Sequence, residues 1–232
     1  MYTDNGFWDT FRAVHPLFTL LYPEVSERVT QSILNAYDES GFMPEWASPG
    51  HRECMIGNNS ISLLTDAWMK GIRTICPEKA LEAMIHQTEA RHPGISSVGR
   101  DGFGYYDRLG YVPYPEVHEA TAKTLEYAYA DWCVARFADS IGRKEIADTY
   151  YRKALNYRNL YYPDYGFMWA KDANGKWRDA FDSTEWGGPF TEGSSWHWTW
   201  SVLHDPEGLS RLMGGHTAME ARLDSMFTAP NT

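Results

Sequence analysis

Hydrophobic and polar positions follow helical spacing along most of the chain, and no long stretch alternates as a half-buried β-strand would. The pattern predicts a first helix over about 7–21, kinked by Pro16 because proline removes a backbone hydrogen bond. A second helix is predicted over 23–40, with Pro23 in its first turn and Gly41 ending it.

The same spacing predicts further helices downstream, at 60–70, 77–91, 117–140, 144–161, 195–203, 206–212 and 217–226. One segment differs from this pattern. Residues 166–181 are typical of a small β-hairpin that turns at Asn174-Gly175. The fold class that follows is all-α.

The connections between the predicted helices alternate in length. Those that follow the second, fourth and sixth helices are long, at 41–59, 91–116 and 163–194, and the others are short. The even-numbered helices also carry more charge, with seven charged residues between Arg143 and Leu160 against two in the first helix. Buried inner helices paired with solvent-facing outer helices would give this pattern, and such pairs side by side form an antiparallel α/α toroid. All long loops would then gather at one end.

A helical-repeat solenoid is the alternative architecture. "ADTYYRKALNYRNLYY" resembles a tetratricopeptide helix, but no fixed period of about 34 residues runs through the chain. The long loops also do not suit that repeat, so the toroid is favoured.

Composition narrows the function. Aromatic residues make up 15% of the chain, including 10 Trp and 15 Tyr, and such rings either fill a core or stack on sugar faces. The net charge of −10 and the absence of a Lys/Arg cluster argue against nucleic-acid binding. Three cysteines show no metal-binding or redox spacing, and no apolar run reaches membrane-spanning length.

The loops that lead into the expected inner helices share glycine, aromatic residues and a carboxylate or arginine. They are "GFWDTFR", "GFMPEWASPGHRECMIGNN", "GRDGFGYYDRLGYVPYPEVHEAT" and "GGPFTEGSSWHW". Binding residues commonly lie on loops held by a rigid scaffold, so these four predict an aromatic, acidic carbohydrate site. The alternative is that glycine and aromatic residues merely pack long loops.

Individual residues on these loops have structural readings as well. Asp9 could complement a helix dipole and pair with Arg12. Glu192 could cap the helix that follows it, or donate a proton to a sugar. Asp66 and Lys70 form an ordinary helix pair. The histidines lack metal-ligand spacing, and neither a GxSxG nor a GxGxxG motif is present.

Several of these segments together resemble one known family. The chain resembles the catalytic domain of the calcium-dependent α-mannosidases of glycoside hydrolase family 92. The resemblance rests on motifs in the family's order: "GFWDTFRAVHPLFTLLYPE", "GFMPEW", "MIGNNSISLLTDAWMKGI", "EATAKTLEYAYADWCVARFADSIG" and "FTEGSSWHWTWSVLHDPEGLSRLMGG".

The resemblance implies an (α/α)6-type toroid and hydrolysis of α-linked mannose, of the α-1,2 type, with inversion. It implies that Glu192, the glutamate of the "TEG" motif, is the general acid. The tryptophans that follow it would wall a cleft of low polarity, which favours a neutral carboxyl group. Trp8, Asp9, Arg12 and Trp196 would help bind the substrate, a mannose-containing glycan. A calcium cofactor and a secreted or periplasmic location are also implied.

Two departures from the family's pattern affect leaving-group recognition. Ser194 stands where the family usually has Asn, and His197-Trp198 where Gln-Tyr is common; "MIGNNS" also has Asn where His is common. The family's water-activating carboxylates and calcium segment belong to downstream motifs that these residues do not include, and its β-sandwich domain lies upstream. Asp101, Asp107 and Glu116 are weak candidates for the base.

We therefore expect residues 1–232 to form a single, incomplete toroidal domain that holds the acid without the base and is inactive by itself. Its calcium ligands would lie mostly outside the chain. An open seam would promote self-association or binding of a companion fragment. The alternative functions are another toroidal carbohydrate enzyme, such as a sugar epimerase, and a non-catalytic carbohydrate-binding helical domain.

Overall fold

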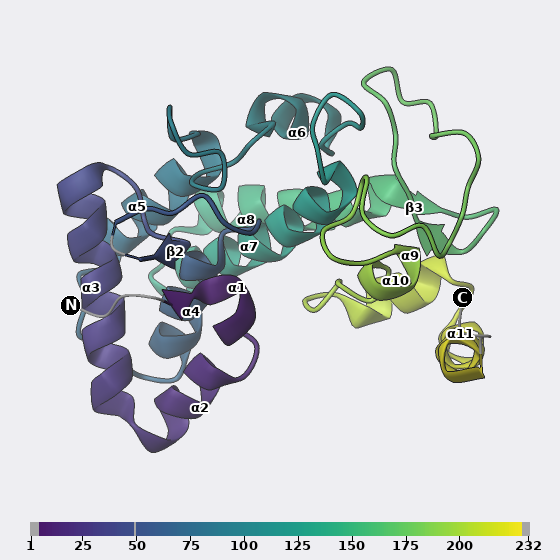
Figure 1. Cartoon of the computed structure of the whole chain (residues 1–232). Helices are drawn as coiled ribbons and strands as arrows, with labels where there is room; N and C mark the ends of the chain where they lie inside the picture. The colour runs from purple at the N-terminus through teal and green to yellow at the C-terminus, as the bar shows by residue number, and fades with distance from the viewer. Residues whose placement is uncertain (1–4, 49, 229–232) are drawn as a thin grey trace. The chain divides into compact units, whose positions relative to one another are not determined.

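The computed structural model describes residues 5–48 and 50–228 and is mainly helical (Figure 1). The chain forms two compact units. The first unit comprises Met1–Phe103 with Ala130–Ala154, and the second comprises Gly104–Tyr129 with Leu155–Thr232. Helix α7, Ala120–Ser140, contributes its first half to the second unit and its second half to the first. The expected single toroidal domain stays a prediction.

The first unit is built from helices and one small sheet. Its elements are α1 (Phe7–Thr10), α2 (Val14–Leu21), α3 (Pro23–Ser40), α4 (Asn59–Met69), α5 (Pro77–Glu89), α8 (Lys144–Lys153), and strands β1 (Asn5–Gly6) and β2 (Trp46–Ala47). The strands pair antiparallel, with Gly6 opposite Trp46. The sequence pattern did not predict this sheet, because each strand is only two residues long.

The first predicted helix is in fact two helices, and the chain breaks ahead of Pro16 instead of kinking at it. Helix α1 ends at Thr10, and α2 begins only at Val14. Pro16 then lies in the first turn of α2, where a missing N–H removes no helical hydrogen bond. Helix α3 matches its predicted bounds, and Gly41 ends it with φ 80°, a left-handed conformation that glycine adopts without strain.

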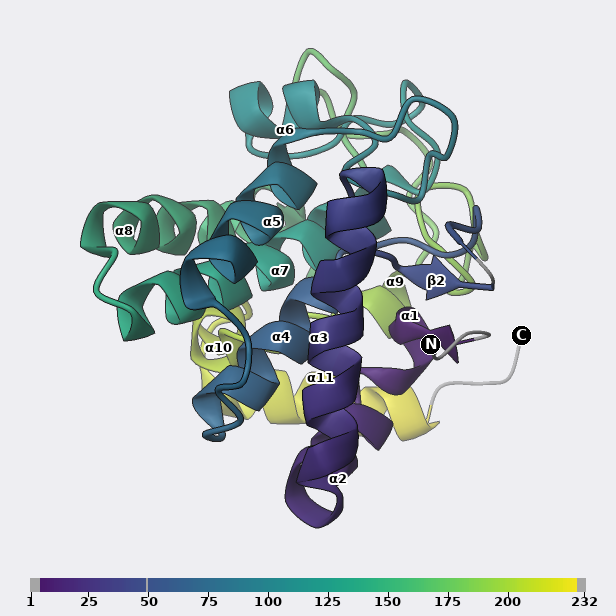
Figure 2. The same cartoon turned by 90° about the vertical axis from the view of Figure 1, so that its left-hand side faces the viewer.

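Burial separates inner from outer helices in the first unit. Almost every residue of α4 is buried, whereas α3 and α5 each bury one face and expose the other. Figure 2 shows α3 running across the front of α4 with α5 beside them, and α3 contacts both. The predicted alternation is therefore present in these three helices.

Helix α2 departs from that alternation. It was expected to be an inner helix, but only His15 is buried. An apolar face is exposed instead, made of Val14, Leu17, Leu20, Leu21 and the following Tyr22 at 41%, 49%, 76%, 55% and 50%. We call these five residues the α2 face.

The second unit holds shorter elements and longer loops. They are α6 (Phe103–Leu109) and the 3-10 helix η1 (Ala154–Leu160), which both begin at a unit boundary, strands β3 (Tyr161–Tyr162) and β4 (Phe167–Met168), α9 (Ser195–Trp198), α10 (Pro206–Leu212) and α11 (His216–Thr228). Helix α6 was not predicted, and it lies in what was read as a loop. The sixth predicted helix ends early, at Lys153, and continues as η1.

Helix α7 is an inner helix along most of its length. In the second unit Ala120, Leu125 and Ala128 have no exposed surface, and Tyr127 packs with Tyr106 in a cluster with Val112 and Val117. Alanine on several faces lets neighbouring chain segments approach closely. This burial on all sides agrees with the predicted inner role.

The predicted hairpin turn is present, but its ladder is short. Gly175 has φ 84° and its N–H donates to the Asp172 carbonyl at 3.1 Å. An isolated antiparallel bridge between Lys171 and Trp177 flanks the turn. Strand β4 pairs with the preceding β3 instead.

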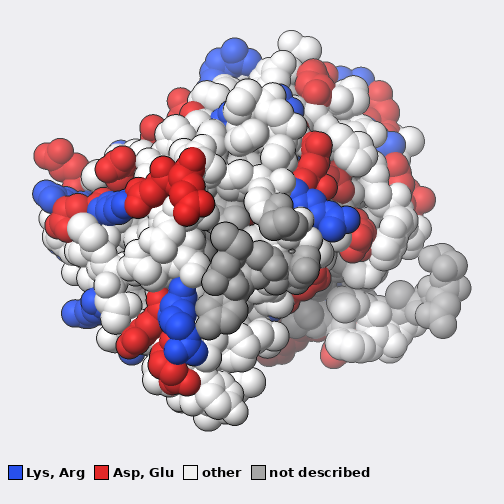
Figure 3. All heavy atoms as spheres, turned by 60° about the vertical axis from the view of Figure 1, so that its left-hand side comes forward, with Lys and Arg blue, Asp and Glu red and all other residues white. Residues whose placement is uncertain are grey.

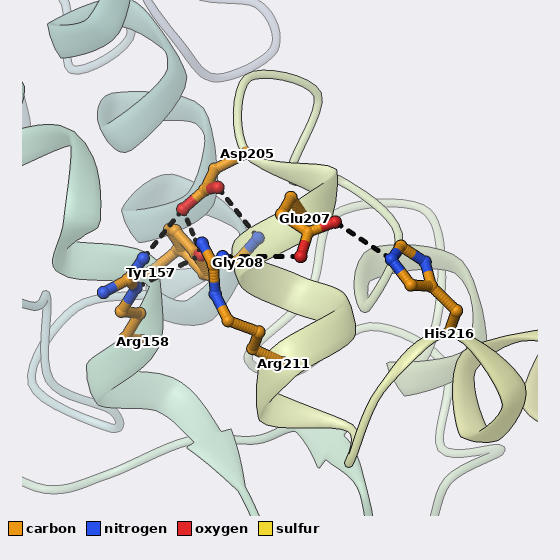
Figure 4. A network of polar contacts seen from close by, with 7 residues as sticks. All are labelled: Tyr157, Arg158, Asp205, Glu207, Gly208, Arg211 and His216. Atoms are coloured by element: carbon orange, nitrogen blue, oxygen red, sulfur yellow. Dashed lines mark hydrogen bonds and ion pairs between the residues drawn. The ribbon is translucent and has the colours of Figure 1, made fainter.

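A polar network fastens α10 to η1 in the second unit (Figure 4). The Asp205 carboxylate accepts hydrogen bonds from the Tyr157 hydroxyl at 2.7 Å, Arg158 Nη2 at 2.9 Å and the Gly208 N–H at 2.8 Å. Asp205 is thus both the N-cap of α10 and an ion-pair partner. Burial, with the bond to Asp205, raises the pKa of Tyr157 to about 12.

The surface carries mixed charge. On the face in Figure 3, acidic and basic side chains are interspersed, with no extended basic area. Within the described ranges, no helix combines the length and apolar character needed to cross a bilayer.

Candidate functional site

The loop that carries Glu192 is closed on itself. The Gly187 N–H donates to the Gly193 carbonyl at 2.9 Å, and the Phe190 N–H donates to the Gly187 carbonyl at 3.1 Å. The loop is also fastened to the start of α7, because the Glu119 N–H reaches the Gly188 carbonyl at 3.2 Å. We call residues 187–193 the acid loop.

The side chains beneath the acid loop are buried. Phe190 and Thr191 are 1% and 4% exposed, and Ser194 and Ser195 are 3% and 0% exposed. Trp198 is buried as well, and its Nε1–H donates to the Thr191 carbonyl at 2.8 Å. This packing fixes the buried side of the acid loop, so that only the tip of the loop is exposed.

Glu192 stands at that tip in a left-handed backbone conformation, with φ 43°. Such a conformation is costly for a non-glycine residue and persists where the surroundings enforce it, often at functional sites. Its side chain is exposed, and its carboxylate has no hydrogen-bond or ion-pair partner among the residues the structure describes. The expected low-polarity pocket walled by tryptophan is therefore wrong within the second unit, since Trp198 points inward.

The helix-capping alternative for Glu192 is also excluded, because other residues cap α9. Ser194 is the N-cap, and His197 accepts a hydrogen bond from the Ser194 N–H at Nδ1, 3.1 Å away. The two residues form a capping box, in which the first and fourth positions satisfy one another. Ser194 and His197, two of the departures from the family pattern, therefore act together as the cap of α9.

Trp196 is half-buried and committed to packing. Its ring meets Phe167 edge to face at 4.7 Å between centroids, and the Arg222 guanidinium lies 5.8 Å from its centre. Its predicted role in substrate binding stays a prediction, and this packing makes support of the acid loop an equally direct role.

The other predicted binding residues lie in the first unit, on and just after α1. Asp9 and Arg12 are exposed, and the Arg12 guanidinium lies 5.3 Å from the centre of the Trp8 ring. The Trp8 indole N–H is buried without a hydrogen-bond partner in the described part of the chain. Residues 8–12 thus carry an aromatic ring, a carboxylate and a guanidinium within one short segment, a combination suited to binding a sugar.

A buried carboxyl group, which the sequence pattern did not single out, supports α1. Glu45 is 5% exposed, and its carbonyl accepts the Phe7 N–H at 3.0 Å. Its carboxyl oxygens accept from the Ser60 N–H at 3.1 Å, the Ser60 hydroxyl at 2.8 Å and Gln87 Nε2 at 3.0 Å. Burial raises the pKa of Glu45 to about 8, against these hydrogen bonds, which favour the charged form.

A second buried network in the first unit was likewise not predicted. Arg100 and Asp131 are 1% and 0% exposed and form an ion pair at 2.8 Å. Arg100 Nε also donates to the Asn58 side chain at 2.7 Å, ahead of α4. Asp131 lies in a segment that carries the family resemblance and Arg100 on one of the long loops, but their 31-residue separation gives no local signal of a pair, and the fold brings them together.

Two of the weaker candidates for the base already have structural partners. Asp101 pairs with Arg91 at 3.2 Å, and Glu116 accepts the Ala173 N–H at 3.3 Å. Asp107 is exposed. Asp66 and Lys70 form the expected helix pair at 2.8 Å. Over residues 5–48 and 50–228, no group of three or more His, Cys, Asp or Glu side chains could hold a metal ion.

Comparison with known proteins identifies the family. A model of the glycosyl hydrolase family 92 catalytic domain matches residues 1–232. The chain is 84% identical to a solved family 92 inverting mannosidase from Bacteroides thetaiotaomicron, with a TM-score of 0.97. The match extends over 100% of this chain and 32% of the solved one.

More distant relatives agree with this match. A solved family 92 alpha-mannosidase from the same organism, in complex with mannoimidazole, is 32% identical over 97% of this chain and 30% of its own, with a TM-score of 0.90. A protein from Arthroderma benhamiae described as an uncharacterized secreted glycosidase is 27% identical over 83% of this chain and 29% of its own. The chain thus spans about a third of the length of these relatives. It belongs to glycosyl hydrolase family 92 and carries sequence of that family's catalytic domain.

Proposed function

We propose that the chain is part of an α-mannosidase that hydrolyses α-linked mannose with inversion, and that Glu192 is its general acid. One observation carries the proposal: Glu192, in the "TEG" motif, is exposed in a left-handed conformation on a loop whose underside is buried. Likeness to a solved inverting mannosidase at 84% identity supports the choice of substrate.

In this mechanism the carboxyl group of Glu192 donates a proton to the glycosidic oxygen as the bond to the anomeric carbon breaks. The exposed position lets a substrate reach it, and the rigid loop holds it for that contact. Trp8, Asp9 and Arg12 would bind the terminal mannose, the ring against a sugar face and the charged groups to hydroxyls. An α-1,2 linkage is the specific preference that we propose.

An inverting enzyme also needs a base about 6.5–9.5 Å from the acid, on the other side of the sugar, to activate water. Asp101 and Glu116 already have partners, and we assign the base to neither. Calcium is expected in the whole enzyme, but the described residues do not gather a suitable ligand set, so no step is assigned to a metal here. We therefore expect these 232 residues alone to hydrolyse no α-mannoside, with or without calcium.

The α2 face supports the proposed incomplete toroid. An inner helix with apolar side chains up to 76% exposed would be covered by another surface in a finished (α/α)6 toroid. For the isolated chain we propose that this face promotes self-association or binding of a companion fragment.

A direct test follows the reaction of α-1,2-mannobiose by proton NMR, using a polypeptide that extends this chain to the length of its solved relatives. Inversion at an α-linkage releases β-mannose first, before mutarotation. Release of α-mannose first would contradict inversion. No hydrolysis of any α-mannoside, with calcium present, would contradict the proposed activity.

A further inference from the structure

Trp186 stands out among the tryptophans because it is exposed. All ten tryptophans lie in the described residues, and Trp186 alone is exposed, at 65%; the others are buried or half-buried. An indole left in water gives up a large hydrophobic stabilisation that burial would provide. An indole this exposed at a fixed position therefore calls for a binding role.

The backbone on both sides of Trp186 is held firmly. The preceding Glu185 carboxylate accepts two hydrogen bonds from the Arg178 guanidinium, at 2.7 and 2.9 Å. The following Gly187 donates the bond to Gly193 that closes the acid loop. Trp186 thus directly precedes the acid loop, at the end where the Gly187–Gly193 hydrogen bond holds the loop closed.

His197, five residues after Glu192, completes the surface. Its exposed ring meets the Trp186 ring edge to face, with centroids 5.4 Å apart and an interplanar angle of 81°. Since Nδ1 accepts the Ser194 N–H, the proton of the neutral ring lies on Nε2. His197 therefore offers an N–H donor beside an aromatic face.

We propose that Trp186 and His197 form the binding surface for the leaving-group sugar, next to Glu192. Trp186 would stack on the apolar face of that sugar, and His197 Nε2–H would donate to one of its hydroxyls. This inference rests on the proposed function, because it assigns the side of the acid on which the departing sugar lies. It makes the two residues determinants of specificity, whereas the proton transfer belongs to Glu192.

The test uses the full-length polypeptide and two substrates. α-1,2-Mannobiose has a leaving-group sugar, and α-mannosyl fluoride has none. For Trp186→Ala we expect kcat/KM on mannobiose to fall about tenfold, the size typical of one lost aromatic contact. Turnover of the fluoride should stay within about twofold. Trp186→Phe should recover most of the loss.

Matched variants separate binding from folding. Tyr165→Ala removes another aromatic ring of the second unit, which is 46% exposed, and should leave kcat/KM unchanged on both substrates. His197→Gln keeps an acceptor for the Ser194 N–H and a donor for a hydroxyl, so it should lose less kcat/KM on mannobiose than His197→Ala does. His197→Ala should slow mannobiose selectively.

The outcomes are distinguishable. Equal losses on both substrates for Trp186→Ala, or no loss on either, would overturn the leaving-group assignment while leaving the proposed function in place. A wild-type polypeptide inactive on both substrates would overturn the proposed function, and this inference with it.

Discussion

The buried Glu45 carboxyl group predicts an unusual pH dependence of stability. Its pKa in the folded chain is raised by burial from 4.5 to about 8, although donors from Ser60 and Gln87 favour the ionised form. Between these two values the folded chain keeps a proton that the unfolded chain releases. The stability contribution is therefore fully present below about pH 4.5 and is lost as pH rises toward 8.

The magnitude follows from the difference between the two pKa values. One pKa unit corresponds to about 1.4 kcal/mol, so a rise from 4.5 to about 8 gives an upper limit of roughly 5 kcal/mol. About 3–4 kcal/mol of this would be lost between pH 5 and pH 9. Glu45→Gln has no titrating group at this position, and it should lack this part of the pH dependence.

Equilibrium denaturation at pH 5 and pH 9 measures the effect as a difference between wild type and Glu45→Gln. Glu82→Gln changes an exposed glutamate on α5 and serves as the control. Parallel pH dependences for wild type and Glu45→Gln would refute the reasoning. Loss of the Glu45 contribution toward acid, instead of toward alkali, would show that the hydrogen bonds outweigh burial and that the group is a carboxylate.

Three further predictions concern packing and association. Gly208→Ala should lower the free energy of unfolding of the second unit by about 2–4 kcal/mol, because a Cβ would collide with the Asp205 carboxylate and the Tyr157 hydroxyl. The control Gly104→Ala places its Cβ in open space and should change that free energy little. Arg100→Met should cost about 3–5 kcal/mol by leaving Asp131 buried without its ion pair, against less than about 1 kcal/mol for the exposed Lys70→Met. Light scattering of the isolated chain should show self-association that Leu17→Lys with Leu20→Lys reduces, and a monomer with the unaltered α2 face would contradict the proposed seam.

Local signals in the sequence predicted the elements whose ends depend on neighbouring residues. Pro23 and Gly41 bound α3, and Pro77 and Pro206 begin α5 and α10 as expected, because each acts through its own backbone. The prediction was less successful where tertiary contacts decide. Helix α6 lies within a glycine-rich loop that the pattern read as irregular.

The candidate site divides in the same way. Its motif and the resemblance pointed to Glu192, yet its left-handed backbone and its exposure depend on hydrogen bonds that close the acid loop. Glu45 was missed because its partners Ser60 and Gln87 are 15 and 42 positions away. Trp186 was missed because exposure of one tryptophan among ten cannot be read from spacing.

The central claim, that Glu192 donates the proton, is tested most directly by Glu192→Gln in the full-length polypeptide. The amide keeps the size of the side chain and removes the transferable proton. We predict that kcat on α-1,2-mannobiose falls by about 10²–10⁴-fold, the usual contribution of general acid catalysis. The variant should hydrolyse α-mannosyl fluoride much closer to the wild-type rate, because fluoride leaves with little protonation. An equal loss on both substrates would contradict the account and would show that Glu192 holds the sugar or the fold.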